Sequence, residues 1–498
     1  MNNPLQKKIN YWLKTHVLTE KLNNILGIFI LTILALSIAY ISNIIALKGL
    51  IAILLALVAI PSLLLSITYL QIGLSIIVII SFFLLGIKKL VPSLPLGITL
   101  DVYIYLMFFM LIIKQLKSSN NNYFNNPITY LAIIWLIYNF IELFNPIASS
   151  QIAWFYTVRS IAGQLLLYFI SLFVLNSLKI TIQFIKLILG LSFLAALYGL
   201  YQEFFGLMAW ERQWLFADME RYHLYFQWGR LRIFSFISDP MTFGILMANM
   251  GLFCFILVFG PFGFFKKIIL LAMCLSMFLA SAYSGTRTAF AIIPIGVIFF
   301  TFISMKREVW YLSFVALFFG TLFMLKSTGN PVLYRIQSAF KVKDDPSMQV
   351  RLENQAFIQP FIQQNPIGGG LGSTGAWGKR FSPNTMLANF PPDSGYVRIA
   401  IEQGWIGLLI YCCFLFFSMK HGIQAYFRTK NETIRIFYMA FLTLLFNLCV
   451  TNYTQEVIMQ IPTSVIFYIT LAALVRLKTF DGMDLSSRSE VFGHFRTR

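Results

Sequence analysis

Apolar runs of about 20 residues recur along this 498-residue chain, and each is long enough for one helix to cross a bilayer. Hydrophobic residues make up 58% of the sequence and charged residues 11%, whereas soluble domains carry about 25% charged residues. We therefore predict an all-α fold, a polytopic transmembrane helical bundle of about 12–14 spans. The predicted spans lie near 25–45, 49–66, 68–87, 99–116, 128–146, 159–177, 183–205, 240–260, 267–284, 288–304, 309–325, 395–418, 434–452 and 462–476.

The short basic connections between these runs predict how the bundle is oriented. Lys and Arg are enriched in cytoplasmic loops, and a cytoplasmic N-terminus places most of the short basic connections inside. Lys88 and Lys89 are the exception, because they fall outside. We expect 1–325 to hold eleven helices with an outer aromatic loop at 206–239, 326–394 to form a large helical or looped outer segment, 395–476 to hold the C-terminal helices, and 477–498 to form a cytoplasmic tail.

The net charge of +19 does not indicate a nucleic-acid-binding protein. The basic residues stand between apolar runs, and no recognition module is visible. The five cysteines lie inside apolar runs and the four histidines are scattered, so the sequence predicts no metal-ligand cluster. We expect no cofactor and no metal.

Three arginines stand at the predicted outer boundary of the bundle. Arg159 lies in YTVRSIAG, Arg232 in GRLRIFSFISDPMTFG and Arg287 in SAYSGTRTAF. A guanidinium presents a planar fork of donors that suits phosphate groups, so several at one face favour an anion site. The alternative is that each arginine anchors its helix at the interface or pairs with Asp239 or Glu402.

The stretch from Arg351 to Gly407 is polar and glycine-rich, unlike its surroundings. Asp393 precedes the last part of it, where a carboxylate can cap the next helix or act as a general base. The run Gly368–Gly372 lacks the GxxxxGK[ST] pattern of a phosphate loop, and we interpret it as a flexible turn. Besides Arg159, the candidate substrate-binding residues are Arg230, Asp239, Arg398 and Glu402, of which the last two are spaced to share one helix face.

These motifs together resemble the O-antigen ligase and polymerase superfamily. The features that carry the resemblance are RIFSFISDPMTFG, the SGTR turn, NPIGGGLG and PPDSGYVRIAIEQGWIGLL, in the order expected over residues 200–475. The resemblance implies a metal-independent glycosyltransferase at the outer face of the bacterial inner membrane, acting on a polyprenyl-pyrophosphate-linked oligosaccharide and a glycan acceptor. Its pyrophosphate-handling arginines would match Arg232 and Arg287, which with Asp393 form our catalytic candidates.

Ligases of this superfamily carry a His followed by Asn where this chain has Asp393-Ser394. That departure favours a polymerase of O-antigen or exopolysaccharide repeat units, with a ligase that transfers glycan to lipid A-core or another acceptor as the alternative. A glycolipid transporter or flippase would be expected to show repeated halves with broken helices at the midplane, which the sequence does not clearly show. A purely structural subunit is the remaining alternative. Besides donor, acceptor and bilayer, other polysaccharide-assembly membrane proteins are candidate partners.

Overall fold

The computed structural model describes residues 69–90, 96–115, 124–227, 229–325 and 346–481, with isolated positions at 11, 32, 65, 66 and 337. The chain divides into two compact units, Met1–Leu65 and Ser66–Arg498, and every element named below belongs to the second. The predicted spans at 25–45 and 49–66 lie outside the described residues apart from isolated positions. Trp228, 326–345 apart from position 337, and the tail beyond Asp481 also lie outside them.

Within the described residues, eleven helices are long and apolar enough to cross a membrane, so the chain is an all-α multi-pass membrane protein. The helix α14 (Arg307–Leu325) coincides with the predicted span at 309–325 but is not among these eleven. The spanning helices are α4 (Leu70–Leu90), α5 (Leu96–Gln115), α6 (Pro127–Ile141) with η3 (Glu142–Phe144), α7 (Gln151–Val174), α8 (Leu178–Phe205), α11 (Pro240–Val258), α12 (Phe264–Tyr283), α13 (Arg287–Ser304), α19 (Gly395–Arg428), α20 (Glu432–Thr454) and α21 (Thr463–Arg476) with η6 (Leu477–Phe480).

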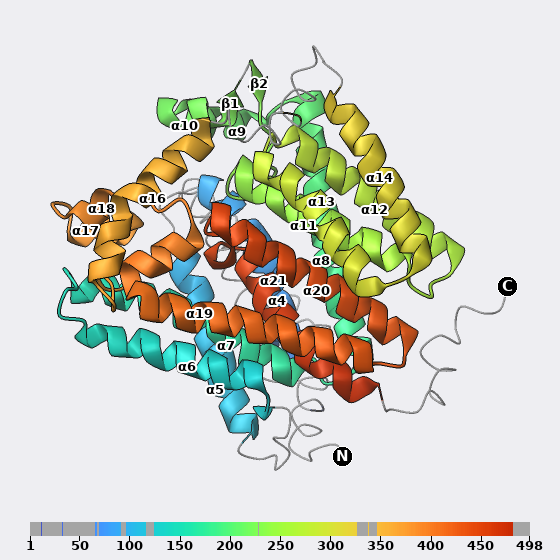
Figure 1. The fold of residues 1–498 in the computed structure, drawn as a ribbon, viewed down its shortest axis with the longest axis horizontal. Helices are drawn as coiled ribbons and strands as arrows, with labels where there is room; N and C mark the ends of the chain where they lie inside the picture. The colour runs from blue at the N-terminus through green and yellow to red at the C-terminus, as the bar shows by residue number, and fades with distance from the viewer. Residues whose placement is uncertain are drawn as a thin grey trace. The chain divides into compact units, whose positions relative to one another are not determined.

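Two groups of short elements join the spanning helices (Figure 1). The first lies between α8 and α11 and comprises α9 (Ala209–Phe216), α10 (Met219–Tyr225) and the antiparallel strands β1 (Phe226–Gln227) and β2 (Arg230–Leu231). The second lies between α14 and α19 and comprises α16 (Pro346–Gln364), α17 (Gly375–Phe381) and α18 (Met386–Asn389). The short 3₁₀ helix η5 (Val457–Met459) lies between α20 and α21.

Hydrogen bonds between these connections show which helix ends lie together. The Thr286 hydroxyl, before α13, donates to the Pro240 carbonyl at the start of α11. The Ser394 hydroxyl, before α19, donates to the Asn452 carbonyl near the end of α20. We call this end of the bundle, formed by the starts of α11, α13 and α19 and the end of α20, the site end; the other is the far end.

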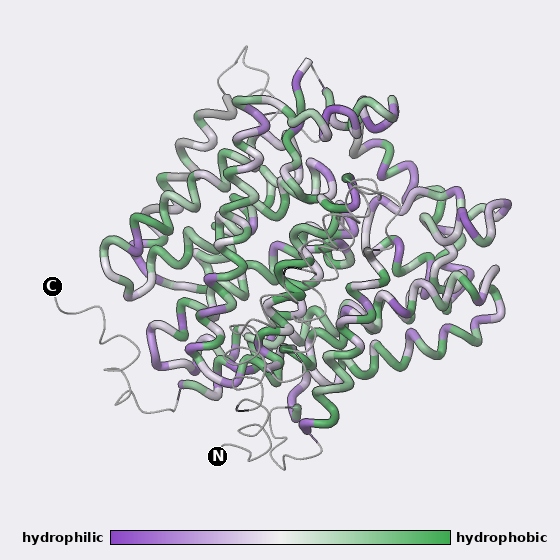
Figure 2. Tube along the Cα trace, turned by 180° about the vertical axis from the view of Figure 1, so that it is seen from behind, coloured by the Kyte–Doolittle hydropathy of each residue, from purple (hydrophilic) through white to green (hydrophobic). Residues whose placement is uncertain are grey.

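Burial separates the inner helices of the bundle from the outer ones. In their most apolar stretches, α11 and α21 are 83% buried, whereas α12 is 22% buried and exposes Phe264 and Phe265. Figure 2 shows hydrophobic residues along most of each spanning helix, with hydrophilic stretches concentrated in the connections. This distribution is the one expected where the outer helices face hydrocarbon rather than water.

Of the two lysines that depart from the pattern of basic connections, Lys88 is exposed and Lys89 is buried. It lies at the end of α4, is 8% exposed, and donates from Nζ to the Ile237 carbonyl oxygen at 2.5 Å. Its Nζ also lies 4.1 Å from the centroid of the Phe234 ring and 4.9 Å from that of Trp214. The Lys89 ammonium is therefore enclosed by aromatic residues of the connection between α8 and α11. It does not lie exposed in a loop, so it does not count toward the orientation of the bundle in the membrane.

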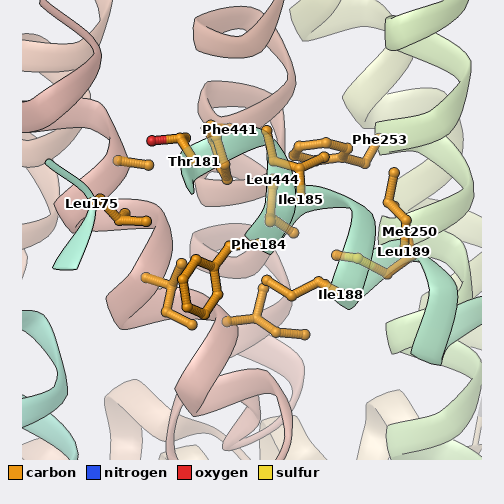
Figure 3. Close-up of a pocket in the computed structure, with 13 residues that line it drawn as sticks. Leu175, Thr181, Phe184, Ile185, Ile188, Leu189, Met250, Phe253, Phe441 and Leu444 are labelled. Atoms are coloured by element: carbon orange, nitrogen blue, oxygen red, sulfur yellow. The ribbon is translucent and has the colours of Figure 1, made fainter. Parts of the chain in front are cut away.

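Figure 3 shows an apolar pocket between helices of the bundle. Side chains of α8, α11, α20 and α21 line it, together with Leu175, and Thr181 is the one polar residue among them. The cavity has no charged lining residue, so the polar chemistry of the chain lies elsewhere.

Candidate functional site

Arg232 and Arg287 meet at the turn before α13. The Arg232 guanidinium donates from Nε to the Ser284 carbonyl at 3.0 Å and from Nη2 to the Thr286 hydroxyl at 3.3 Å. Arg287 is the next residue and the first of α13. Burial lowers the pKa of Arg232, the charges of Asp239 and Tyr225 oppose this, and the charge of Arg287 lowers the pKa further. The structure therefore brings two of the predicted arginines together at the site end.

Asp239 caps the start of α11 beside this pair. Its carboxylate accepts hydrogen bonds from the Met241 and Thr242 amides, both at 2.9 Å, and from the Thr242 and Ser238 hydroxyls at 2.8 and 2.6 Å. These four hydrogen bonds hold the carboxylate in place as the cap of α11. Asp239 therefore orders the start of this helix.

Arg398 and Glu402 share one face of α19, as their spacing predicted. Arg398 Nε lies 3.1 Å from Glu402 Oε1, and Arg398 Nη1 lies 2.5 Å from Glu456 Oε2. The Glu402 carboxylate also accepts from the Gly372 amide at 3.1 Å and from the Thr374 hydroxyl at 2.5 Å. We call Arg398, Glu402 and Glu456 the acid–arginine cluster; it ties the second group of short elements to α19 and to the turn after α20.

The glycine run beside this cluster is tightly packed, so our interpretation of it as a flexible turn is wrong. The Gly369 and Gly370 amides donate to the Ile401 and Glu402 carbonyls at 2.8 and 2.9 Å. Helix α19 is interrupted at Gly404, where φ is +68°, and a Cβ there would lie 1.9 Å from the Pro366 carbonyl oxygen. Backbone groups of a broken helix inside a membrane protein need partners within the protein, and the glycine run supplies them.

The same run also packs against the start of α7. A Cβ at Gly370 would lie 2.5 Å from that of Ala148, and a Cβ at Gly372 would lie 2.4 Å from the Thr157 hydroxyl oxygen. Both glycines have positive φ values, +89° and +77°, which side chains disfavour. The run holds α7 and α19 together and so fixes the position of the acid–arginine cluster.

Asp393 is exposed at the start of α19, but it is not the helix cap. That role belongs to Ser394, whose hydroxyl accepts from the Val397 amide at 3.5 Å, so the predicted alternative role for Asp393 is wrong. Asp393 Oδ2 accepts a hydrogen bond from the side-chain amide of Asn354 at 3.5 Å. Burial raises the pKa of Glu456, Arg398 lowers it, and the nearby charges of Glu402 and Asp393 raise it further. Two carboxylates, Glu402 and Glu456, therefore contact Arg398, and the charge of Asp393 acts on Glu456.

The turn after α20 connects the two halves of this site. Glu456 contacts Arg398, and four residues later the Gln460 side-chain oxygen lies 2.6 Å from the Thr242 hydroxyl oxygen. Neither residue was predicted from the sequence. Their signal was a carboxylate among several polar side chains in the short connection TQEVIMQIP between two apolar runs, where an acidic residue is costly unless it has a function.

Two predicted binding residues are engaged in separate ion pairs. Arg159 Nε lies 3.0 Å from Asp101 Oδ2, and Arg230 Nη1 lies 3.9 Å from Glu203 Oε1. Arg159 stands in the third turn of α7, not at a helix start, because α7 begins at Gln151 after its cap Ser150. Across the described residues, no group of three or more His, Cys, Asp or Glu side chains could hold a metal ion.

One protein family matches the part of the chain that carries much of this site. Residues 271–412 match the model of the O-antigen ligase family. This match supports the resemblance of the chain to the O-antigen ligase and polymerase superfamily. The matched segment runs from α12 into α19, and it includes Arg287, Asp393 and the Arg398–Glu402 pair. The match supports a membrane glycosyltransferase of the ligase or polymerase type. No curated protein matches the chain.

Proposed function

We propose that the chain polymerises repeat units of a surface polysaccharide, O-antigen or exopolysaccharide, at the outer face of the bacterial inner membrane. The observation that carries this proposal is that the Arg232–Arg287 pair and Asp393 lie at the same end of the bundle. There Glu456 contacts Arg398 of α19, and Gln460 contacts Thr242 of α11. The donor is a polyprenyl-pyrophosphate-linked oligosaccharide, and the acceptor is the end of another lipid-linked glycan.

The two arginines bind the pyrophosphate of the donor. When the anomeric C–O bond breaks, the electron pair stays on the leaving pyrophosphate, and two guanidiniums held in place beside it stabilise that charge. Carbonyl and hydroxyl acceptors at Ser284 and Thr286 fix the Arg232 guanidinium before substrate arrives. Because the donors are preorganised, little reorganisation is needed during the reaction.

Asp393 is the general base of the proposed reaction. The acceptor hydroxyl attacks the anomeric carbon, a new C–O bond forms, and the hydroxyl proton passes to the Asp393 carboxylate. Asp239 is occupied as a helix cap, and Glu402 is occupied by Arg398, Gly372 and Thr374. Asp393 is exposed and makes one long contact with Asn354, so it can approach an incoming sugar.

A ligase that transfers the glycan to lipid A-core or another acceptor is the second candidate. The match to the O-antigen ligase family favours it, whereas the Asp393-Ser394 pair in place of the ligase His-Asn pair favours the polymerase. The glycans of a deletion strain separate the two. Loss of the polymerase leaves single repeat units on the lipid carrier, whereas loss of the ligase leaves full-length polymer that is not attached to its acceptor.

A further inference from the structure

A second cavity, lined by charged as well as apolar side chains, lies at the far end of the bundle, away from the candidate site. Its lining comes from the end of α11, the end of α13, the start of α14, the last turns of α19 and the start of α20. The opposite ends of α11, α13, α19 and α20 form the site end, so the two regions are separated by the length of the bundle.

Two basic side chains line this cavity. Lys306 is exposed in the turn between α13 and α14, and Arg435 lies in the first turn of α20. The Arg435 guanidinium carbon is 4.8 Å from the centroid of the Tyr426 ring, which restrains the guanidinium. Glu432 also lines the cavity, so the lining carries two basic side chains and one acidic side chain.

Arg435 has an unused donor. Its Nε is fully buried and makes no hydrogen bond within the part of the chain that the structure describes. A buried donor without an acceptor is unfavourable, and an anionic oxygen would satisfy it with a charge-assisted hydrogen bond. The cavity is therefore suited to an anion.

The remaining walls of the cavity are apolar. Phe259, Phe300 and Met439 line it beside the basic residues, and Phe300 and Met439 are each 1% exposed. Just outside, the exposed side chains of Phe302 and Trp310 form an edge-to-face pair at 5.3 Å. Tryptophan is enriched where a membrane protein meets the bilayer interface. A ligand with a phosphate at one end and hydrocarbon at the other fits this combination better than a free ion.

We propose that this cavity binds the headgroup of an anionic phospholipid, with its phosphate between Lys306 and Arg435 and its acyl chains extending past the exposed side chains of Phe302 and Trp310. Basic pockets between transmembrane helices are a general mode of recognition for anionic lipid headgroups. The lipid-binding proposal is independent of whether the protein is a polymerase or a ligase.

Lipid binding to the purified full-length protein tests this proposal. We would titrate detergent-solubilised protein with phosphatidylglycerol or phosphatidylcholine and count bound lipids by native mass spectrometry. Each basic residue beside an anionic lipid contributes about fivefold in affinity, so Lys306→Gln/Arg435→Gln should weaken phosphatidylglycerol binding by about 30-fold. Lys306→Gln alone changes an exposed side chain and should weaken it by about fivefold even if the double variant does not fold.

The control variant Lys267→Gln/Lys430→Gln removes two charges from the same end of the bundle but from outside the cavity lining. It should bind phosphatidylglycerol as the wild type does. Equal binding of the two lipids by the wild type, or equal losses in the control and cavity variants, would overturn the proposal. Displacement of phosphatidylglycerol by millimolar inorganic phosphate would also overturn it, because the cavity would then be a site for free phosphate.

Discussion

The acid–arginine cluster makes a quantitative prediction for Arg398→Met. This substitution keeps much of the apolar length of the side chain but removes the guanidinium that contacts both Glu402 and Glu456. The side chains of these glutamates are 4% and 18% exposed, so two largely buried carboxylates would lose their shared counter-charge. Breaking a buried ion pair from one side typically costs about 3–5 kcal/mol, and we expect a loss of stability in that range.

Two variants calibrate this value. Glu456→Gln leaves Arg398 paired with Glu402 and should cost about 1.5–3 kcal/mol, the scale of one hydrogen bond to a charged group. Arg230→Met removes an arginine whose ion pair is longer, at 3.9 Å, and whose side chain is 50% exposed. Exposed pairs contribute about 0–1 kcal/mol, so Arg230→Met is the matched control.

The assay is equilibrium unfolding in mixed micelles, followed by tryptophan fluorescence. It reports the free energy of unfolding of each variant against the wild type. The predicted order of destabilisation is Arg398→Met, then Glu456→Gln, then Arg230→Met. If Arg398→Met is no more destabilising than Arg230→Met, the acid–arginine cluster does not stabilise the start of α19.

Three further predictions concern the break in α19, the start of that helix and the proposed pyrophosphate-binding arginine. Gly404→Ala places a Cβ against the Pro366 carbonyl at positive φ, so it should lower protein yield and the thermal midpoint, whereas Gly190→Ala, in open space, should not. Ser394→Ala should cost about 1 kcal/mol in unfolding free energy through loss of the helix cap, whereas Asp393→Asn should leave stability unchanged and abolish polymer formation. Arg287→Ala should reduce the rate of polymer formation by about a hundredfold or more, and Arg287→Lys should restore part of it, because lysine lacks the bidentate fork; full activity of Arg287→Ala at normal protein level would exclude a pyrophosphate-binding role.

The spanning helices were predictable because each is specified locally. A run such as 183–205 is apolar throughout, and the structure confirms a helix there, α8, extended to Leu178–Phe205. The starts of the helices were less predictable. Asp393 and Ser394 are both residue types that cap well, and only the observed backbone shows that Ser394 takes this role.

The partners within the site were not predictable, because they come from segments far apart in the sequence. Glu456 pairs with Arg398 across 58 positions, and the Gly372 amide reaches Glu402 across 30. The glycine run had the composition of a flexible turn, and its tight packing depends on the interruption of α19 at Gly404. Spacing within one helix predicted only the Arg398–Glu402 pair, since residues four apart on a helix are neighbours.

Elongation by the purified protein tests the proposed polymerase most directly. The protein would be incubated with a lipid-linked repeat unit as the one glycan substrate, and the lipid-linked products and released polyprenyl pyrophosphate would be separated by mass. The wild type should form lipid-linked glycans of two and more repeat units and release one polyprenyl pyrophosphate for each new bond. Asp393→Asn and Arg287→Ala, folded and at equal concentration, should release little or none. Wild-type elongation by both variants, or no elongation by the wild type, would contradict the proposed function.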